Sequence, residues 1–192
     1  MVFGEESVVR SLERLQTDQL DLLMVHNMNG TDELMPKLVD WKKAGRIRYL
    51  GVTTSSERDH ARMVDAMNAY PLDFIQVNYS LGDRSAEKVV LPQARKRGVA
   101  VMVNVPFGGR GGRTLSTVLG TPLPAWAADI GATSWAQVLL KFVVSHPAVT
   151  VAIPGTTSVK HMRDNQRAAL GPIPDAAARA RIVQDWDELT GA

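Results

Sequence analysis

The run Leu20-Asp21-Leu22-Leu23-Met24-Val25-His26 is apolar apart from Asp21 until it ends in a histidine. A nearly continuous apolar run of this length is typical of a parallel strand that is covered on both faces. Four further strand-like runs follow it: Ile47–Val52, Phe74–Asn78, Val99–Val105 and Thr150–Ile153. Their starts lie 27, 27, 25 and 51 residues apart, so each interval has room for a helix and its turns. This spacing predicts βαβ units in series, as in an α/β sheet or barrel.

Polar residues stand where these predicted strands end. They are His26 and Asn27, Thr53 and Thr54, Gln76 and Asn78, Asn104, and Gly155-Thr156-Thr157. In parallel α/β folds the carboxyl ends of the strands share one edge, and chemistry is placed there. The recurrence of polar groups at one end of apolar strands therefore predicts a site at that edge.

The segments between the strands carry helical periodicity. Helices are expected over Glu5–Gln16, Asp32–Ala44, a segment capped by Ser55 or Ser56 and ending near Ala69, Asp83–Arg97, Trp135–His146, Val159–Leu170 and Asp175–Leu189. The glycine-rich segment Phe107–Arg113 is expected to be a flexible basic loop. No repeat or low-complexity segment interrupts this order, and residues 1–192 are interpreted as one domain.

Composition narrows the function classes. The 192 residues carry a net charge of +2 with both signs mixed, so no nucleic-acid or acidic-membrane footprint stands out. The absence of cysteine excludes disulfides, thiolate metal sites and thiol catalysis. No apolar run approaches the roughly 18–20 residues of a membrane span, and a cytoplasmic protein is expected. No Walker-type loop, no G-x-G-x-x-G after a strand and no histidine pair at metal-ligand spacing is present, which argues against a nucleotide triphosphatase, a Rossmann site and a metal site.

The histidines divide into one candidate for catalysis and three weaker cases. His26 ends an apolar strand, where an imidazole can polarise a carbonyl or transfer a proton, or can simply be satisfied by a backbone group. His60 and His146 are interpreted as structural or solvated. His161 opens a helix, where it could face a bound anion.

Two small-residue segments could bind phosphate. Gly155-Thr156-Thr157-Ser158 joins a strand to a helix and offers backbone N–H groups and hydroxyls to an anion, although an ordinary capping turn has the same residues. The segment Gly108–Arg113 could fold over a diphosphate or could be a mobile linker. The sequence pattern leaves both alternatives open.

The ordered segments resemble the aldo-keto reductase superfamily, and most closely its bacterial members. The matching segments are Asp21–Asn27, Trp41–Val52, Phe74–Ser80, Val103–Gly108, Ala136–Phe142, and Ile153–Thr156 followed by His161 and Asp164-Asn165. The resemblance covers nearly the whole chain. It implies a (β/α)₈ barrel fold, binding of NADPH or NADH, and reduction of a small aldehyde or ketone to an alcohol by hydride transfer.

The resemblance also assigns roles to residues. His26 is implied to be the catalytic histidine, which orients the substrate carbonyl and supports a proton-donating tyrosine. The implied cofactor-binding residues are Thr53, Thr54, Gln76, Asn104, Pro106, Gly108, Gly155, Thr156, His161 and Asn165. Within this set, Thr53, Thr54 and Gln76 correspond to the group that holds the nicotinamide carboxamide. Asn104 stands where many members have a tyrosine that stacks on the nicotinamide ring.

The sequence departs from the family pattern in two ways, and each departure leads to an expectation about cofactor binding or activity. Gly155 replaces a frequent lysine and His161 a frequent arginine, which removes positive charge that would pair with a 2′-phosphate. We therefore expect relaxed cofactor choice or a tilt toward NADH. The family's catalytic Asp, Tyr and Lys come from the first three βα units, and this chain corresponds to barrel strands four to eight, a partial (β/α) barrel.

Three hypotheses follow from that second departure. The chain is the C-terminal part of a reductase, expected to be inactive alone and to self-associate through exposed strand edges. Alternatively it is a non-catalytic NAD(P)-binding or regulatory module derived from a reductase barrel. The third hypothesis, an unrelated open α/β domain, is disfavoured by the number of ordered matches.

Overall fold

The computed structural model describes residues 5–191, with the side chains of all of these except residues 5 and 110–112. Five strands form one parallel sheet in the order β1-β2-β3-β4-β5. They are β1 (Leu20–Val25), β2 (Ile47–Thr53), β3 (Phe74–Asn78), β4 (Ala100–Asn104) and β5 (Val151–Ala152). All five predicted strands are thus confirmed, as is the parallel α/β class, although β5 is only two residues long.

Alternation of burial along the central strands shows which face the helices cover. Ile75 and Val77 of β3 and Val101 and Val103 of β4 are completely buried. Phe74 and Gln76 of β3 and Ala100 and Met102 of β4 are only partly buried. Because successive side chains of a strand point to opposite faces, the sheet has one face packed into the core and one more open face.

Helices and 3-10 turns fill the intervals between the strands. They are α1 (Glu5–Leu15), η1 (His26–Met28), α2 (Thr31–Lys43), η2 (Glu57–Asp59), α3 (His60–Ala69), η3 (Ser85–Glu87), α4 (Val90–Arg97), α5 (Gly109–Thr117), η4 (Ala125–Ala128), α6 (Trp135–Val144), α7 (Val159–Arg167) and α8 (Ala176–Thr190). The expected stop after α4 is confirmed, because Gly98 adopts the left-handed conformation (φ +68°) that glycine tolerates without a steric penalty.

The glycine-rich segment after β4 differs from the prediction. It was expected to be a flexible loop, but helix α5 begins within it at Gly109. Glycine disfavours helices, so tertiary packing decides here. The buried Thr114 of α5 packs against Gly82 and Gly108, and its hydroxyl lies 3.3 Å from the Ser80 hydroxyl. The interpretation of this segment as a loop is therefore wrong.

Other differences from the predicted elements are smaller. The helix expected over residues 83–97 is divided into η3 and α4, and α7 ends at Arg167 instead of Leu170. Of the two alternatives for His60, structural or solvated, the structural one is confirmed, because only 4 % of its surface is exposed. His146 has a structural role, since its Nδ1 accepts a hydrogen bond from the Ala148 N–H at 3.2 Å and its ring packs edge-on against Tyr79.

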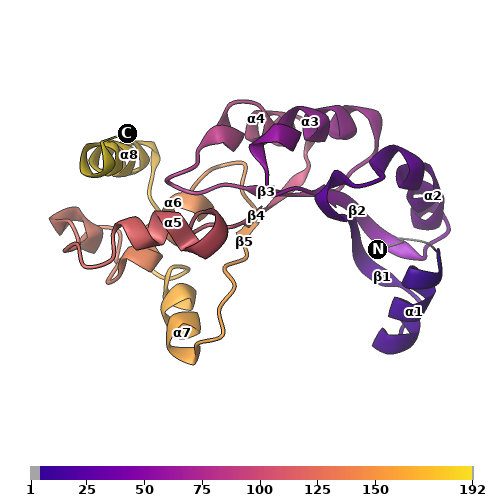
Figure 1. The fold of residues 1–192 in the computed structure, drawn as a ribbon, viewed down its shortest axis with the longest axis horizontal. Coiled ribbons are helices and arrows are strands. Elements are labelled where there is room, and N and C mark those ends of the chain that lie inside the picture. The colour runs from indigo at the N-terminus through magenta and orange to yellow at the C-terminus, as the bar shows by residue number, and fades with distance from the viewer. Residues whose placement is uncertain (1–4, 192) are drawn as a thin grey trace.

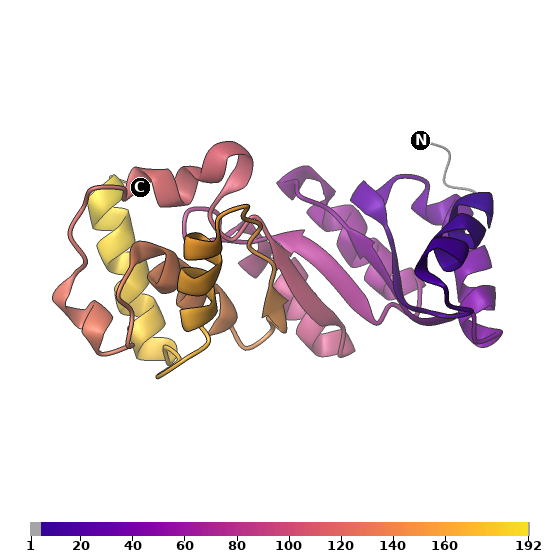
Figure 2. The same cartoon turned by 90° about the horizontal axis from the view of Figure 1, so that it is seen from below.

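The sheet is open rather than closed. Figures 1 and 2 show an elongated arrangement, with α1 and α2 beside β1 at one end and α5, α6, α7 and α8 beyond β5 at the other. Within residues 5–191, β1 and β5 each pair on one side only. The architecture is that of a partial barrel. In the same residues, no helix is both long and apolar enough to cross a membrane.

Candidate functional site

The register of the sheet brings the predicted strand-end residues to one edge. Thr53 of β2 pairs with Gln76 of β3, and Asn78 of β3 pairs with Asn104 of β4. Val25 pairs with Val52, which places the next residue, His26, level with Thr53. Paired residues of neighbouring strands point to the same face. Thr53 and Gln76 therefore lie side by side, as the sequence predicted.

His26 lies just beyond the end of β1, in the turn η1 and exposed to solvent. The next residue, Asn27, donates its backbone N–H to the Thr53 hydroxyl at 2.9 Å, which joins the ends of β1 and β2. Asn27 and Met28 both adopt positive φ angles (54° and 56°), a conformation uncommon for residues other than glycine. This sharp turn leaves the His26 ring at the edge of the sheet.

Thr53 and Thr54 have different environments although they are adjacent. Both are buried, with 4 % and 1 % of their surfaces exposed. The Thr54 hydroxyl donates to Asp59 Oδ2 at 2.9 Å and accepts from the Ser56 N–H at 3.1 Å. Thr53 accepts the Asn27 N–H and keeps its own hydroxyl hydrogen as a donor. Thr53 therefore retains donor capacity that Thr54 has already used within the protein.

Asn104, at the end of β4, is held by its amide nitrogen. Its Nδ2 donates to the Thr54 carbonyl at 2.9 Å, while its buried Oδ1 has no hydrogen-bond partner among the described residues. The next residue, Val105, has φ +45°, which is an outlier for a β-branched residue. Strained backbone of this kind clusters at functional sites, because surrounding structure must hold it in place.

His60 and Asp83 form a hydrogen-bonded group with Asn78 at the end of β3 that the sequence did not indicate. His60 Nε2 lies 3.0 Å from Asn78 Oδ1, and Asn78 Nδ2 donates to Asp83 Oδ2 at 2.8 Å. Since the carboxylate can only accept, the Asn78 amide oxygen faces His60, and Nε2 carries the hydrogen. Only the tertiary structure brings these groups together, because His60 is on α3 and Asp83 is in the loop after β3.

Asp83 makes the stability of the fold sensitive to acid. Burial raises the pKa of this carboxyl, but hydrogen bonds from Ser85 and Asn78 outweigh that effect and hold the pKa below 3.8. A carboxyl with a lowered folded-state pKa stabilises the fold above its unfolded pKa, and this contribution is lost as the pH falls through the folded value. We expect the free energy of unfolding to decrease below about pH 3.8, and less steeply in Asp83→Asn. Urea unfolding measured at pH 5, 3.5 and 2.5 checks this; equal slopes for the two proteins would contradict it.

The other predicted cofactor residues lie farther along the chain. Pro106 is buried and Gly108 precedes α5, whereas Gly155 and Thr156 belong to the loop after β5. Ser158 caps α7 by accepting the His161 N–H at 3.3 Å, and Thr156 Oγ1 accepts the Ser158 N–H at 3.1 Å. The capping interpretation of this turn is confirmed. His161 is exposed on α7, and Asn165, one helical turn later, is buried.

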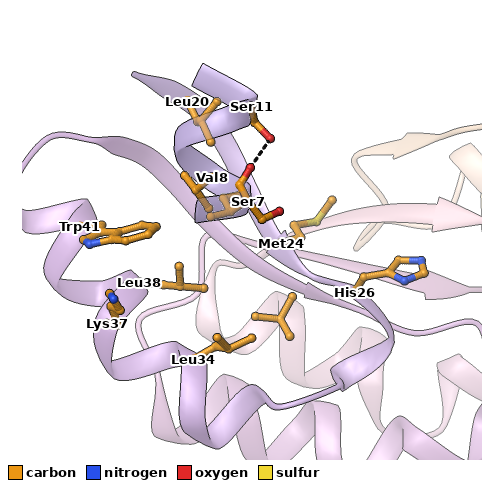
Figure 3. Close-up of a pocket in the computed structure, with 12 residues that line it drawn as sticks. Ser7, Val8, Ser11, Leu20, Met24, His26, Leu34, Lys37, Leu38 and Trp41 are labelled. Atoms are coloured by element: carbon orange, nitrogen blue, oxygen red, sulfur yellow. Dashed lines mark hydrogen bonds between the residues drawn. The ribbon is translucent and has the colours of Figure 1, made fainter. Parts of the chain in front are cut away.

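Two pockets lined mainly by apolar residues flank the edges of the sheet rather than the row of strand ends. One, of about 450 Å³, lies between α1, α2 and β1 and is lined by Val8, Leu20, Leu34, Leu38 and Trp41, among others, with His26 at its rim. In Figure 3 the His26 ring extends away from Trp41 and Leu38. The second, of about 600 Å³, lies between β5, α6 and α7. Both pockets border the strands that pair on one side only.

Comparison with known proteins places this arrangement in a family. The family model for the "Aldo/keto reductase family" matches residues 4–180, which is most of the chain. The chain belongs to the aldo/keto reductase family. The resemblance noted from the sequence, including its fit to bacterial members, is thereby confirmed.

The relatives of this aldo/keto reductase family chain include bacterial enzymes. It is 32% identical over 160 residues to methylglyoxal reductase YeaE of Escherichia coli, covering 81% of this chain and 55% of that protein. It is 34% identical over 108 residues to the NADH-specific methylglyoxal reductase of Escherichia coli, covering 53% of this chain and 32% of that protein. The chain spans about half the length of the curated relatives that match most of it.

A solved structure of an aldo/keto reductase from Klebsiella pneumoniae in complex with NADP and acetate has the same fold. It superposes with a TM-score of 0.75 at 26% sequence identity, covering 94% of this chain and 64% of that one. The open five-stranded sheet thus corresponds to part of an aldo/keto reductase barrel.

Proposed function

We propose that this chain carries the nicotinamide-binding side of an NAD(P)H-dependent aldo-keto reductase, which reduces an aldehyde or ketone to an alcohol. The observation that carries this proposal is the row of polar groups at the carboxyl edge of the sheet, with Thr53 and Gln76 in register on one face. Two relatives named as methylglyoxal reductases and the NADP complex from Klebsiella pneumoniae support it.

The side chains at this edge suit a nicotinamide carboxamide. That group has one acceptor oxygen and one donor NH₂. The Gln76 amide offers both complements, and the Thr53 hydroxyl offers a donor hydrogen. Thr54 is committed to Asp59 and Ser56, so it shapes the site without binding there. Asn104, anchored to the Thr54 carbonyl, borders the same site.

Carbonyl reduction needs a hydride for the carbon and a proton for the oxygen. When bound, a reduced nicotinamide supplies the hydride. The exposed His26 imidazole can donate an N–H to the carbonyl oxygen and so orient the substrate. A neutral imidazole that remains hydrogen-bonded polarises the carbonyl, and a separate acid must then deliver the proton.

The three tyrosines of the chain are poorly suited to be that acid. Tyr79 is completely buried, and its hydroxyl donates to Glu87. The Tyr70 hydroxyl donates to Asp32 at 3.2 Å. Tyr49 lies within β2, four residues before Thr53, and its ring packs edge-on against Phe74. We therefore propose that the 192-residue chain alone binds cofactor with little or no turnover, which also favours a non-catalytic NAD(P)-binding or regulatory role as the second candidate.

The open edges belong to the same proposal. In the described part of the chain, β1 and β5 each have one edge without a neighbouring strand, beside an apolar pocket, and such edges favour pairing with another chain. We propose self-association through them, and a monodisperse monomer in sedimentation or sizing experiments would contradict it.

A cytoplasmic location stays a prediction from the sequence.

Fluorescence titration with NADPH and NADH, alongside an assay of methylglyoxal-dependent cofactor oxidation, tests the proposed function. We expect saturable binding, weakened in Gln76→Ala, with cofactor oxidation no faster than the enzyme-free background. Absence of binding to either cofactor would overturn the proposal for this chain, and clear turnover would show that another group delivers the proton.

Because Gly155 and His161 lack the charge of lysine and arginine, we expect the two dissociation constants to be similar or to favour NADH, and strong NADPH preference would refute that expectation.

A further inference from the structure

Thr54 is the most connected residue of the strand-end group. Its hydroxyl hydrogen is donated to Asp59 Oδ2 at 2.9 Å, and its oxygen accepts the Ser56 N–H at 3.1 Å. The direction of the first bond is certain, because a carboxylate can only accept. With 1 % of its surface exposed and its single hydroxyl hydrogen committed, Thr54 has nothing left to donate to a ligand.

The Thr54 backbone connects the neighbouring strands. Its N–H donates to the Gln76 carbonyl of β3 at 2.9 Å, and its carbonyl accepts Asn104 Nδ2 of β4 at 2.9 Å. The Asn104 amide must present its nitrogen here, since a carbonyl cannot donate. The position of Thr54 therefore controls how the ends of β2, β3 and β4 are spaced, and with them the side chains of Thr53 and Gln76.

Asp59 is well placed to hold Thr54. It lies at the end of η2, directly before α3. Its Oδ2 accepts from Thr54 and its Oδ1 lies 3.4 Å from Arg62, so both carboxylate oxygens have a partner within the protein. The residue after it, His60, holds Asn78 of β3 at 3.0 Å. One short segment thus anchors the ends of two adjacent strands.

We propose that Asp59 is a positioning residue of the nicotinamide site, acting through Thr54 without touching the ligand. The proposal rests on the proposed function, since it names how the site that binds the carboxamide is held in shape. What Asp59 contributes is a hydrogen-bond acceptor at a defined place rather than its charge. Asparagine offers an acceptor oxygen of the same reach, whereas alanine leaves the buried Thr54 hydroxyl without an acceptor.

Three variants separate positioning from a general effect on stability. Asp59→Ala removes the acceptor, and Asp59→Asn keeps one. Lys42→Ala is the matched control: Lys42 Nζ lies 2.6 Å from Asp73 Oδ1, and Asp73 accepts the Leu50 N–H at 2.8 Å, so this ion pair supports β2 at a distance from the strand ends. For each variant the dissociation constants for NADPH and NADH are measured together with the free energy of unfolding.

We expect Asp59→Ala to weaken binding of both cofactors about tenfold, because a buried hydroxyl is left unsatisfied. Asp59→Asn is expected to bind within about threefold of the parent, a rescue that a charge-based role would not show. Lys42→Ala is expected to lose stability while its dissociation constants are unchanged. Equal binding by the parent and Asp59→Ala, or equal weakening in Lys42→Ala, would overturn this inference alone. A parent chain that binds neither cofactor would overturn the proposed function and this inference with it.

Discussion

Replacing Gly51 with alanine is expected to lower the free energy of unfolding by about 3 kcal/mol. A Cβ at this position would lie 2.4 Å from the Phe74 carbonyl oxygen and 3.0 Å from Met24 Cγ. The first contact is the serious one, because it is with backbone. Gly51 is paired with both Met24 of β1 and Phe74 of β3, so β2 cannot shift away from one neighbour without disturbing the other.

Gly109→Ala is the matched control, because a Cβ at Gly109 would meet no atom within 4 Å. We expect its free energy of unfolding to stay within about 0.5 kcal/mol of the parent value. Urea unfolding followed by circular dichroism measures both variants. A Gly51→Ala protein with an unchanged unfolding midpoint would show that the strands relax more easily than their pairing indicates.

Arg179→Leu is expected to have a second large effect, a loss of about 3 kcal/mol of unfolding free energy. Arg179 of α8 donates to the Tyr79 hydroxyl at 2.8 Å, to Glu87 Oε1 at 3.1 Å and to the Ser145 hydroxyl at 2.8 Å. It also donates to the Phe142 carbonyl. One largely buried guanidinium therefore ties α8 to α6, to η3 and to the segment after β3, and its removal leaves several polar groups with fewer partners.

Two further variants sharpen this prediction. Arg179→Lys is expected to recover only part of the loss, since an ammonium cannot reproduce the planar fork of donors. Arg181→Ala, which removes an exposed arginine of the same helix, is expected to change stability by less than about 0.5 kcal/mol. Equal unfolding midpoints for the parent and Arg179→Leu would contradict the assigned role.

The same substitution has a spectroscopic readout at His146. Burial and the nearby Arg179 charge lower the pKa of His146 below 6.5. Removing that charge is expected to raise the pKa toward 6.5 without reaching it, because burial remains. NMR titration of the imidazole measures this, and an unchanged His146 pKa would mean that the charge of Arg179 is not felt there. Because the folded-state pKa of His146 is lowered, the protein also loses stability as the pH falls below 6.5.

Local sequence patterns predicted the helices and strands well where the hydrophobic periodicity of a segment agrees with its burial in the fold. The run Phe74–Asn78 forms a strand with the predicted bounds, and Gly98 ends α4 as expected. The signals failed where local preference and packing conflict. Glycine-rich residues after Gly108 form α5 because Thr114 packs against Gly82 and Gly108, a contact between segments that no local pattern reveals.

In the candidate site, too, some features could be predicted from the sequence and others could not. Parallel strands of known order must bring their carboxyl ends to one edge, so Thr53, Gln76 and Asn104 could be placed together from the sequence. Their assignment as cofactor-binding residues stays a prediction. The different environments of Thr53 and Thr54 could not be predicted, because they depend on the hydrogen bond between Thr54 and Asp59, which forms only in the folded chain. The structural interpretation of His60 is confirmed, but its partner could not be identified from the sequence, because Asn78 is 18 residues away.

The sequence by itself determined the order of the strands, their direction and the family, because hydrophobic spacing and short motifs are properties of contiguous residues. Tertiary structure alone decided which polar groups are free to bind and which are committed within the protein. That distinction depends on hydrogen bonds between segments that are distant along the chain, such as Asn104 to Thr54 and Arg179 to Tyr79. A hydrogen bond requires its partners to meet within about 3 Å at a suitable angle, and this geometry exists only after the sheet and its helices have packed.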